Sequence, residues 1–298
     1  NVVGSNIFNV LFILGLSAMI APLVVNLQLI RQEVPIMIGA SVLLLLLGLD
    51  GKLSWSDGGI LVVLMVAYTA FLIVQSRTQV KDAQADFDAE IKPAGPGDWD
   101  SKLPAQLALI VVGLGLLVLG SEWLVSSAVV FAQAMGVSDV VIGLTIVSAG
   151  TSMPEVATSV AAALKGERDI AVGNVVGSCT FNIFACLGIS SLVAVPVGLA
   201  VAPSLLAFDM WIMLAVAFAC LPIFLTGREI ARWEGGVFLA YYTAYVVYLI
   251  LDAQGHDALE LYSSTMLSFV VPITVITLVV SLLRGRPSAA GAGSGSNL

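Results

Sequence analysis

A short polar motif, GTSMPE at residues 150–155, interrupts a long apolar stretch of this chain. Pro154 has no amide hydrogen and its ring clashes with the carbonyl of Gly150, so a helix is expected to kink or break here. The carbonyl groups near Gly150 and Thr151 then lose their usual partners, which hydrocarbon tolerates only if protein, water or an ion replaces them. Thr151 and Glu155 are four residues apart and share a helix face. The motif therefore gathers carbonyl, hydroxyl and carboxylate oxygens, the donors that hard cations such as calcium prefer.

Glu155 is the residue of this motif with the strongest indication of function. A carboxylate in the middle of a membrane span costs ~2.5–3.5 kcal/mol or more and is a functional candidate by default. The structural alternative is a pairing with a buried Arg or Lys, but no basic residue falls within an apolar core of the sequence. We therefore expect a mobile cation or a proton to neutralise Glu155.

The next apolar segment carries a Ser/Asn pair that occurs twice in the chain. Ser178 and Asn182 are four residues apart and lie on one helix face, and Ser5 and Asn9 repeat the spacing. Taken alone, such a pair more often forms hydrogen bonds between helices. Its duplication and the nearby Glu155 favour a cation-binding role instead.

The composition identifies the surroundings that these helices need. Hydrophobic residues make up 59% of the chain, charged residues 11%, and the mean hydropathy is +1.02. Soluble domains carry roughly 25% charged residues, so this chain can hide its apolar surface only in lipid. The net charge of -8 and the absence of a basic patch argue against a nucleic-acid partner. The three cysteines show no paired spacing and are expected to be free thiols.

Nine apolar segments are long enough, or nearly so, to cross a bilayer. Alternating the loops between the two sides puts eleven of the twelve Lys and Arg residues on one side and only Lys52 on the other. This bias predicts that the polar linker 77–103 and the C-terminus are cytoplasmic, with the protein in the plasma (inner) membrane. The small-residue tail 287–298 is expected to be disordered. The segments are 1–25, 34–49, 58–75, 104–131, 139–164, 170–195, 208–226, 234–251 and 261–283.

The sequence also contains an internal repeat. Residues 1–18 and 174–191 are identical at ten of eighteen positions at an offset of 173. The counterpart of residues 141–173 would fall before Asn1, so two helices of the first repeat are expected to be missing. Five spans per repeat would place the two copies in opposite orientations, as in many secondary transporters.

The predicted fold is therefore all-α: a polytopic transmembrane helix bundle with two inverted repeats, the first of them truncated. The expected divisions are three helices of the first repeat, a linker, five helices of the second repeat, an extra C-terminal transmembrane helix and a tail. These correspond to residues 1–76, 77–103, 104–252, 253–286 and 287–298.

The motifs resemble those of a known family. GTSMPE followed by GNVVGSCTFN resembles the alpha-repeat of the cation/calcium exchanger superfamily, the sodium/calcium exchangers, and NVVGSNIFN resembles the second half of the partner repeat. The resemblance covers nearly all of residues 1–251, and residues 261–283 add a span beyond the usual ten. It implies inverted five-helix repeats around a cluster of cation sites at the membrane midplane.

The same resemblance assigns metal-binding roles around the GTSMPE motif. It implies that Glu155 is one of two glutamates that hold calcium and share sodium, and that the other lies in the missing part. Thr151 would give its carbonyl to calcium. Ser152 and the carbonyl of Ser148 would serve an outer sodium site.

The Ser/Asn pairs also receive roles from the resemblance. Ser178 and Ser5 look like ligands of an inner sodium site, and Asn182 and Asn9 are expected to line the central site. Some family members carry Asp where this chain has Asn182, so this chain lacks a charge and a titratable group there. The departure leaves the ion stoichiometry open, together with any part played by potassium or protons.

The expected function is secondary active antiport of calcium against sodium by alternating access, with no cofactor besides the transported ions. A proton- or potassium-coupled cation antiporter and a membrane scaffold that does not transport are the alternatives. An intramembrane hydrolase using Ser152 would need a base, and the lone His256 lies outside the spans. The protein is expected not to be an enzyme and to be monomeric, with an oligomer left open. Asp209 is expected at a membrane boundary beside Trp211.

Overall fold

Nine stretches of helix in the computed structural model are candidates for crossing a membrane. The structure describes residues 1–90, 103–134 and 136–284, and within these ranges eight helices are long and apolar enough to span, with one further bent pair as the ninth. This confirms the nine predicted segments. The predicted disordered tail 287–298 lies outside the described residues. The first five helices are α1 (Val2–Phe8), α2 (Gly15–Ile20), α3 (Val34–Gly48), α4 (Trp55–Glu90) and α5 (Leu103–Ala134).

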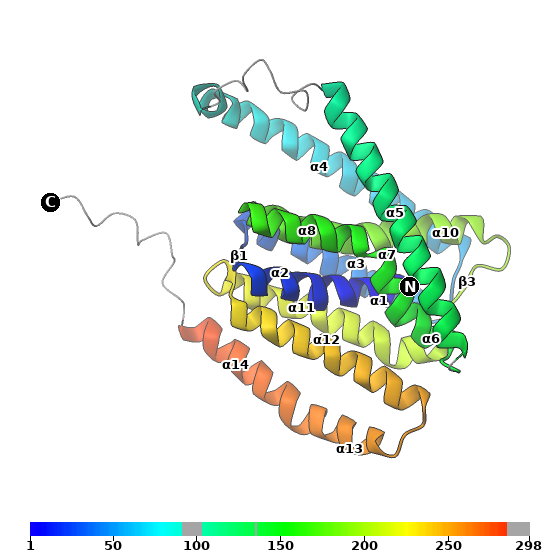
Figure 1. Cartoon of the computed structure of the whole chain (residues 1–298). Coiled ribbons are helices and arrows are strands. Elements are labelled where there is room, and N and C mark those ends of the chain that lie inside the picture. The colour runs from blue at the N-terminus through cyan, green and yellow to red at the C-terminus, as the bar shows by residue number, and fades with distance from the viewer. Residues whose placement is uncertain (91–102, 135, 285–298) are drawn as a thin grey trace.

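The second half of the chain continues the same pattern of helices laid side by side (Figure 1). Several spans consist of two α-helical pieces joined by a short, wider π-helical turn, a feature that often marks functional sites. Two of these turns, Asn9–Leu14 and Asn182–Leu187, lie at equivalent places in the repeat. The remaining helices are α6 (Asp139–Ile142), α7 (Ser148–Thr151), α8 (Met153–Lys165), α9 (Arg168–Phe181), α10 (Gly188–Val193), α11 (Met210–Leu225), α12 (Arg232–Ala253), α13 (Ala258–Thr265) and α14 (Val271–Arg284).

Two small β-ladders show the inverted symmetry of the bundle. Strand β1 (Leu23–Val24) pairs antiparallel with β4 (Glu229–Ile230), and β2 (Lys52–Leu53) pairs antiparallel with β3 (Leu199–Ala200). Each ladder joins a loop of the first repeat to a loop of the second. The two ladders lie at opposite ends of the helices (Figure 1). A two-fold axis in the membrane plane exchanges such ladders, as expected of inverted repeats.

Two helix crossings, each formed by a pair of glycines, also reflect the inverted symmetry. A Cβ on Gly235 of α12 would lie 2.7 Å from the carbonyl oxygen of Gly15 of α2. A Cβ on Gly58 of α4 would lie 2.8 Å from the carbonyl oxygen of Gly188 of α10. Gly15 and Gly188 are equivalent in the repeat, separated by the offset of 173 residues. Small residues allow the helix backbones to approach this closely, and lipid-embedded helices associate through such contacts.

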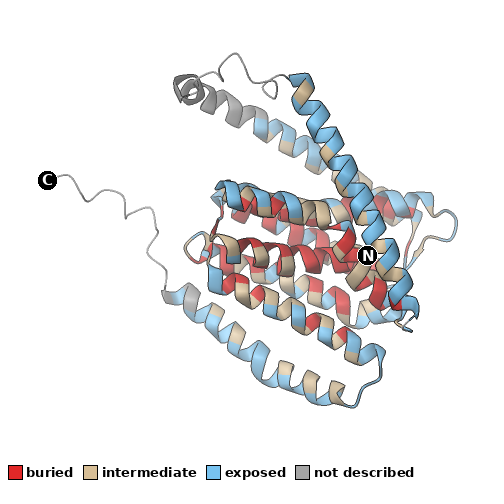
Figure 2. Ribbon diagram, viewed as in Figure 1, coloured by how far each residue is buried: buried red, intermediate tan, exposed pale blue. Residues whose placement is uncertain are grey.

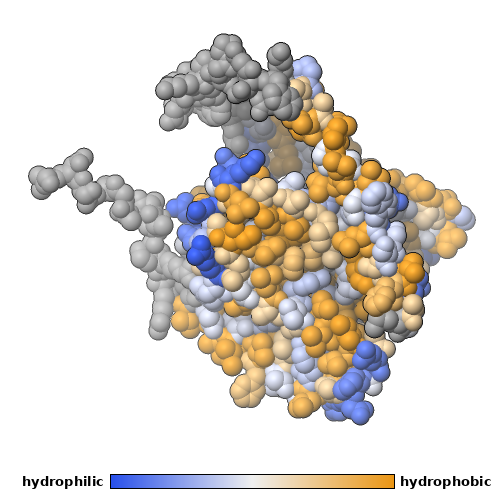
Figure 3. Space-filling model, in the orientation of Figure 1, coloured by the Kyte–Doolittle hydropathy of each residue, from blue (hydrophilic) through white to orange (hydrophobic). Residues whose placement is uncertain are grey.

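The buried residues concentrate in the middle of the bundle, on α1, α2 and α9 and the elements around them (Figure 2). The outer helices α5 and α13–α14 are almost fully exposed in the isolated chain, although their surfaces are apolar. Hydrophobic atoms cover most of the visible face, and hydrophilic atoms gather toward its edges (Figure 3). Such a surface requires a hydrocarbon environment, so the chain is a multi-pass integral membrane protein.

Two features differ from the sequence-based expectations. The helix α4 continues to Glu90, so residues 77–90 of the predicted linker are helical and only residues 91–102 fall outside the described part. Asp209 was expected at an interfacial boundary, but its side chain is only 2% exposed and accepts a hydrogen bond of 2.8 Å from the Tyr245 hydroxyl. The turn Leu205–Asp209, which leads into α11, packs against α12, and the Tyr245 hydroxyl gives the buried carboxylate a polar partner.

Candidate cation-binding site

The polar motif lies at a break between two helical pieces, as the sequence predicts. Residues Asp139–Thr151 and Met153–Lys165 meet at an angle of 46°. Ser152 lies at the break with φ -94° and ψ 6°, and its amide donates to the carbonyls of Ser148 at 3.3 Å and Ala149 at 3.2 Å. The proline ring leaves the carbonyl of Gly150 without its helical partner. The hydroxyl of Ser121, on α5, donates a hydrogen bond to this carbonyl.

The carboxylate of Glu155 stands in the first turn of α8, directly after the break. The Ser178 hydroxyl, on α9, lies against it, whereas Oε2 is buried and has no hydrogen-bond partner among the described residues. The buried polar residues of the described chain include no Lys or Arg. A half-buried carboxylate with one buried oxygen and no basic partner is destabilising unless a proton or a cation neutralises it. The contact with Ser178 brings two of the predicted site residues together.

A second group of predicted residues meets on the other side of the break. The Ser5 hydroxyl, on α1, donates to the carbonyl of Ser148 at 3.4 Å. The hydroxyls of Ser148 and Thr151 both donate to Oδ1 of Asn1 at 3.3 Å. Thr151 is exposed in the isolated chain and Ser152 is buried. The first repeat therefore contributes Ser5 directly to the broken helix of the second repeat.

The predicted asparagines lie where the repeats face each other. Nδ2 of Asn182 donates to Oδ1 of Asn6 at 3.1 Å, and Nδ2 of Asn6 donates to the carbonyl of Cys179 at 3.1 Å. Asn9 is fully buried, the Cys179 thiol lies alongside it, and neither atom of its amide has a hydrogen-bond partner of normal geometry among the described residues. No hydrogen bond joins Glu155 to Asn182 or Asn9 within the described chain. An unpaired buried amide is costly, and a bound cation would satisfy its oxygen.

Three residues that support this arrangement were not identified from the sequence. Asn6 holds Asn182, Ser121 satisfies the broken helix, and Asn174 of α9 donates to the Ser159 hydroxyl at 2.9 Å and to Thr158 at 3.0 Å. Asn174 was detectable because it opens the repeated motif. Asn6 could not be identified from the repeat, because the equivalent position holds Cys179.

The site contains oxygen donors of several kinds around one carboxylate. The described residues hold no group of three His, Cys, Asp or Glu side chains that could bind a metal ion. A carboxylate with hydroxyl, amide and carbonyl oxygens suits a hard cation, and donors of modest charge allow the ion to leave again. A helix broken in mid-membrane, inside an inverted-repeat bundle, is the arrangement in which secondary transporters bind their ions. The fold and the site thus define a secondary active cation transporter.

Comparisons with known proteins identify the family. The model of the sodium/calcium exchanger protein family matches residues 1–74 and 105–251, so the chain belongs to this family. The sodium/calcium exchanger MaX1 of Methanosarcina acetivorans is 32% identical over 284 residues, covering 84% of this chain and 79% of that protein. The inner membrane protein YrbG of Escherichia coli is 36% identical over 190 residues, which is 64% of this chain and 58% of that protein.

A solved structure agrees with this assignment. The sodium-calcium exchanger NCX_Mj, soaked with Na⁺ and Ca²⁺, superimposes with a TM-score of 0.61 at 30% sequence identity. The match covers 83% of this chain and 74% of that one. The chain is thus similar to an exchanger in fold as well as in sequence, and the predicted all-α inverted-repeat fold is confirmed.

Proposed function

We propose that this protein exchanges calcium for sodium across the membrane by alternating access. The observation that carries the proposal is the Glu155 carboxylate, half-buried after the helix break, with Oε2 unpartnered and no buried basic residue in the described chain. Its charge requires a mobile counter-ion. The names of MaX1 and NCX_Mj, both sodium/calcium exchangers, support calcium and sodium as the ions.

The coupling of calcium movement to sodium movement follows from the electrostatic cost of an empty site. Two opposed access states require the site to pass through a conformation that is closed to water on both sides. With calcium or several sodium ions bound, the carboxylate charge is compensated and this conformation is accessible. An unoccupied, charged site would pay a desolvation cost of several kcal/mol per ion in the same conformation. Return of the empty transporter is therefore slow, and one ion species moves against the other.

We assign to the individual donors the roles that the resemblance to the exchanger family implies. Glu155 and the carbonyl of Thr151 bind calcium, and Asn182 and Asn9 line the central site. The Ser152 hydroxyl and the carbonyl of Ser148 belong to an outer sodium site. This assignment is supported by the location of all of them at or beside the helix break or at the interface of the repeats.

The inner sodium site is assigned to Ser178 and Ser5. Ser178 touches the Glu155 carboxylate, and Ser5 touches the carbonyl of Ser148, so each serine links its own helix to the broken span. The two serines are equivalent in the repeat. Their equivalence in the repeat supports the assignment of both serines to the same kind of site.

The proposal extends to topology and organisation. We assign residues 1–76 and 104–252 to the two exchanger repeats and residues 253–286 to an additional transmembrane helix. The excess of Lys and Arg on one side places the linker and the C-terminus in the cytoplasm and the protein in the plasma (inner) membrane. We propose a monomer as the transport unit.

Ion flux in sealed vesicles tests the function. Vesicles containing the protein and loaded with sodium should take up radioactive calcium when diluted into sodium-free buffer, and an ionophore that collapses the sodium gradient should stop the uptake. Potassium and proton gradients, imposed separately, provide the comparison. Uptake driven by a proton gradient alone would assign proton-coupled exchange instead, and no uptake under any gradient would favour a scaffold.

A further inference from the structure

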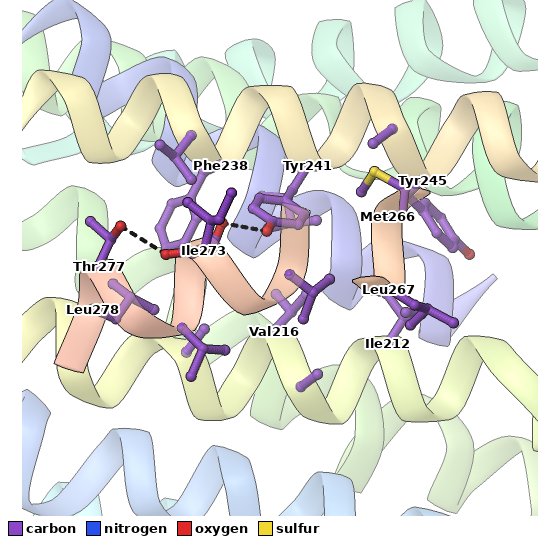
Figure 4. A pocket seen from close by; sticks show the side chains of 18 of the residues that line it. Ile212, Val216, Phe238, Tyr241, Tyr245, Met266, Leu267, Ile273, Thr277 and Leu278 are labelled. Atoms are coloured by element: carbon purple, nitrogen blue, oxygen red, sulfur yellow. Dashed lines mark hydrogen bonds between the residues drawn. The ribbon is translucent and has the colours of Figure 1, made fainter. Parts of the chain in front are cut away.

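A large apolar cavity lies away from the cation site, between α11, α12 and the helix pair α13–α14 (Figure 4). Its volume is about 500 Å³, within the range of pockets that bind small molecules. Side chains of α11 and α12, such as Ile212, Val216 and Phe238, face α14 across it. The match to the exchanger family ends at residue 251, so one wall of the cavity is formed by a segment that the family model does not include.

Three of the four tyrosines in the walls donate hydrogen bonds to protein groups. Tyr241 donates to Thr274 at 2.6 Å, Tyr262 donates to the carbonyl of Ala244 at 2.8 Å, and Tyr245 is held by Asp209. Two of these bonds attach the additional helix pair to α12 at separate points. The rest of the lining is predominantly Leu, Ile, Val, Phe and Ala. An apolar cavity of this kind does not retain water, so its occupant must itself be apolar.

The cavity is elongated along the direction of the helices. Its lining residues on α12 run from Trp233 to Tyr248, which spans about 22 Å at ~1.5 Å per residue. The hydrocarbon core of a bilayer is ~30 Å thick, so the cavity follows most of its depth. A flexible hydrocarbon chain lying parallel to the helices fits this shape.

One end of the cavity carries two exposed arginines, and the buried Glu234 carboxylate, which also lines this end, accepts a hydrogen bond from the Ala231 amide. Trp233 lines it at the start of α12, and Arg232 precedes this tryptophan directly. Arg228, in the preceding loop, and Arg232 are both exposed. Nη2 of Arg232 donates a hydrogen bond to the carbonyl of Ile20 at 3.3 Å. Exposed basic residues at a membrane surface attract anionic lipid headgroups, and tryptophan favours the interface.

We propose that this cavity binds one acyl chain of an anionic glycerophospholipid, whose phosphate lies at Arg228 and Arg232. The lipid fills the space between the exchanger bundle and the additional helix, and thereby attaches α13–α14 to α11 and α12. The site is separate from the cation site and does not depend on the transported ion.

Photolabelling in vesicles tests the proposal. The protein is reconstituted in phosphatidylethanolamine that contains a trace of phosphatidylglycerol with a diazirine on its acyl chain, and the labelled peptides are mapped by mass spectrometry. Label should concentrate on lining residues of α11, α12 and α14. The matched phosphatidylcholine probe should label them at least about fivefold less, because two arginines favour the anionic headgroup.

Two substitutions of alanine by tryptophan distinguish labelling in the cavity from labelling on the general lipid-facing surface. Ala219→Trp fills the cavity and should lower its labelling about tenfold, equivalent to ~1.4 kcal/mol. Ala240→Trp makes the same exchange at an exposed position of α12 outside the cavity and should leave the labelling unchanged. The double variant Arg228→Gln, Arg232→Gln should remove the preference for phosphatidylglycerol while keeping the acyl chain bound.

Several results would overturn the proposal. In the wild-type protein, labelling of the cavity that is no stronger than labelling of the lipid-facing α5 would show that no specific site exists. Unchanged labelling in a folded Ala219→Trp protein would place the chain elsewhere. Equal labelling by both probes would refute the assignment of an anionic headgroup.

Discussion

Asn6 and Cys179 occupy equivalent positions of the two repeats, 173 residues apart, and contact each other reciprocally. The Asn6 amide donates to the Cys179 carbonyl at 3.1 Å, and the Cys179 thiol lies 3.9 Å from the Asn6 carbonyl oxygen. Equivalent positions can meet in this way only at the symmetry axis of an inverted-repeat bundle. Oδ1 of Asn6 accepts a hydrogen bond from Asn182, so the contact at the axis also orients a residue of the cation site.

This arrangement predicts that Asn6 positions Asn182. With Nδ2 of Asn182 bound to Asn6, Oδ1 of Asn182 is directed away from Asn6, where its one contact among the described residues is a weak one from the Cys186 thiol at 3.9 Å that a cation would displace. Asn6→Ala should remove a buried hydrogen bond worth ~0.5–1.5 kcal/mol and raise the KM for calcium about threefold to tenfold. The maximal rate should change less, and calcium-dependent uptake at varied calcium concentrations measures both.

A matched control for Asn6 is available in the adjoining helix. The Thr180 hydroxyl is buried, and among the described residues it bonds only to the carbonyl of Val176 in its own helix at 3.2 Å. Thr180→Ala therefore removes a buried hydrogen bond without touching Asn182, and its KM should remain that of the wild type. Equal KM shifts in the two variants would show that Asn6 acts only through general packing.

Neutralising Glu155 should abolish exchange. Glu155→Gln removes the charge that binds the cation but keeps the size of the side chain, so sodium-driven calcium uptake should fall at least about a hundredfold, or ~2.7 kcal/mol. The exposed Glu122 of α5 provides the control, and Glu122→Gln should retain uptake. Undiminished exchange by the Glu155→Gln protein would contradict the proposed site.

The glycine crossings predict position-specific effects on stability. Gly235→Ala would place a methyl group 2.7 Å from a backbone carbonyl, whereas next to it Gly236→Ala meets only the Met19 sulfur at 3.5 Å. On α4, Gly58→Ala would meet backbone at 2.8 Å, and Gly59→Ala has nothing within 4 Å. Overpacking costs ~1–3 kcal/mol. Thermal unfolding in detergent should show lowered Tm for Gly235→Ala and Gly58→Ala but not for their neighbours.

The buried pair of Asp209 and Tyr245 predicts energetic coupling between α11 and α12. Tyr245→Phe leaves the carboxylate without its 2.8 Å donor and should destabilise the protein by ~1–3 kcal/mol. Combining it with Asp209→Ala, which removes the acceptor, in a double-mutant cycle should give a coupling of at least ~0.5 kcal/mol. Strictly additive Tm changes would mean that this hydrogen bond contributes nothing to packing of the two helices.

The sequence alone determined the membrane spans, the break in the helix at Pro154 and the repeat with its inverted symmetry. Each of these depends on local properties, namely the length of an apolar run, the geometry of the proline ring and the identity of residues at a fixed offset. The motif around Glu155 also indicated which side chains gather oxygen donors. These features could be predicted because neighbours along the chain produce them.

Only the tertiary structure decided which helix faces meet. The spans are apolar on nearly every side, so their residue patterns do not distinguish a lipid-facing side chain from a buried one. For this reason the burial of Asp209 against Tyr245, the hydrogen bond from Ser121 to the broken helix and the contact of Asn6 with Asn182 were not predicted. Each joins residues from different helices, and packing of the folded bundle fixes their separation.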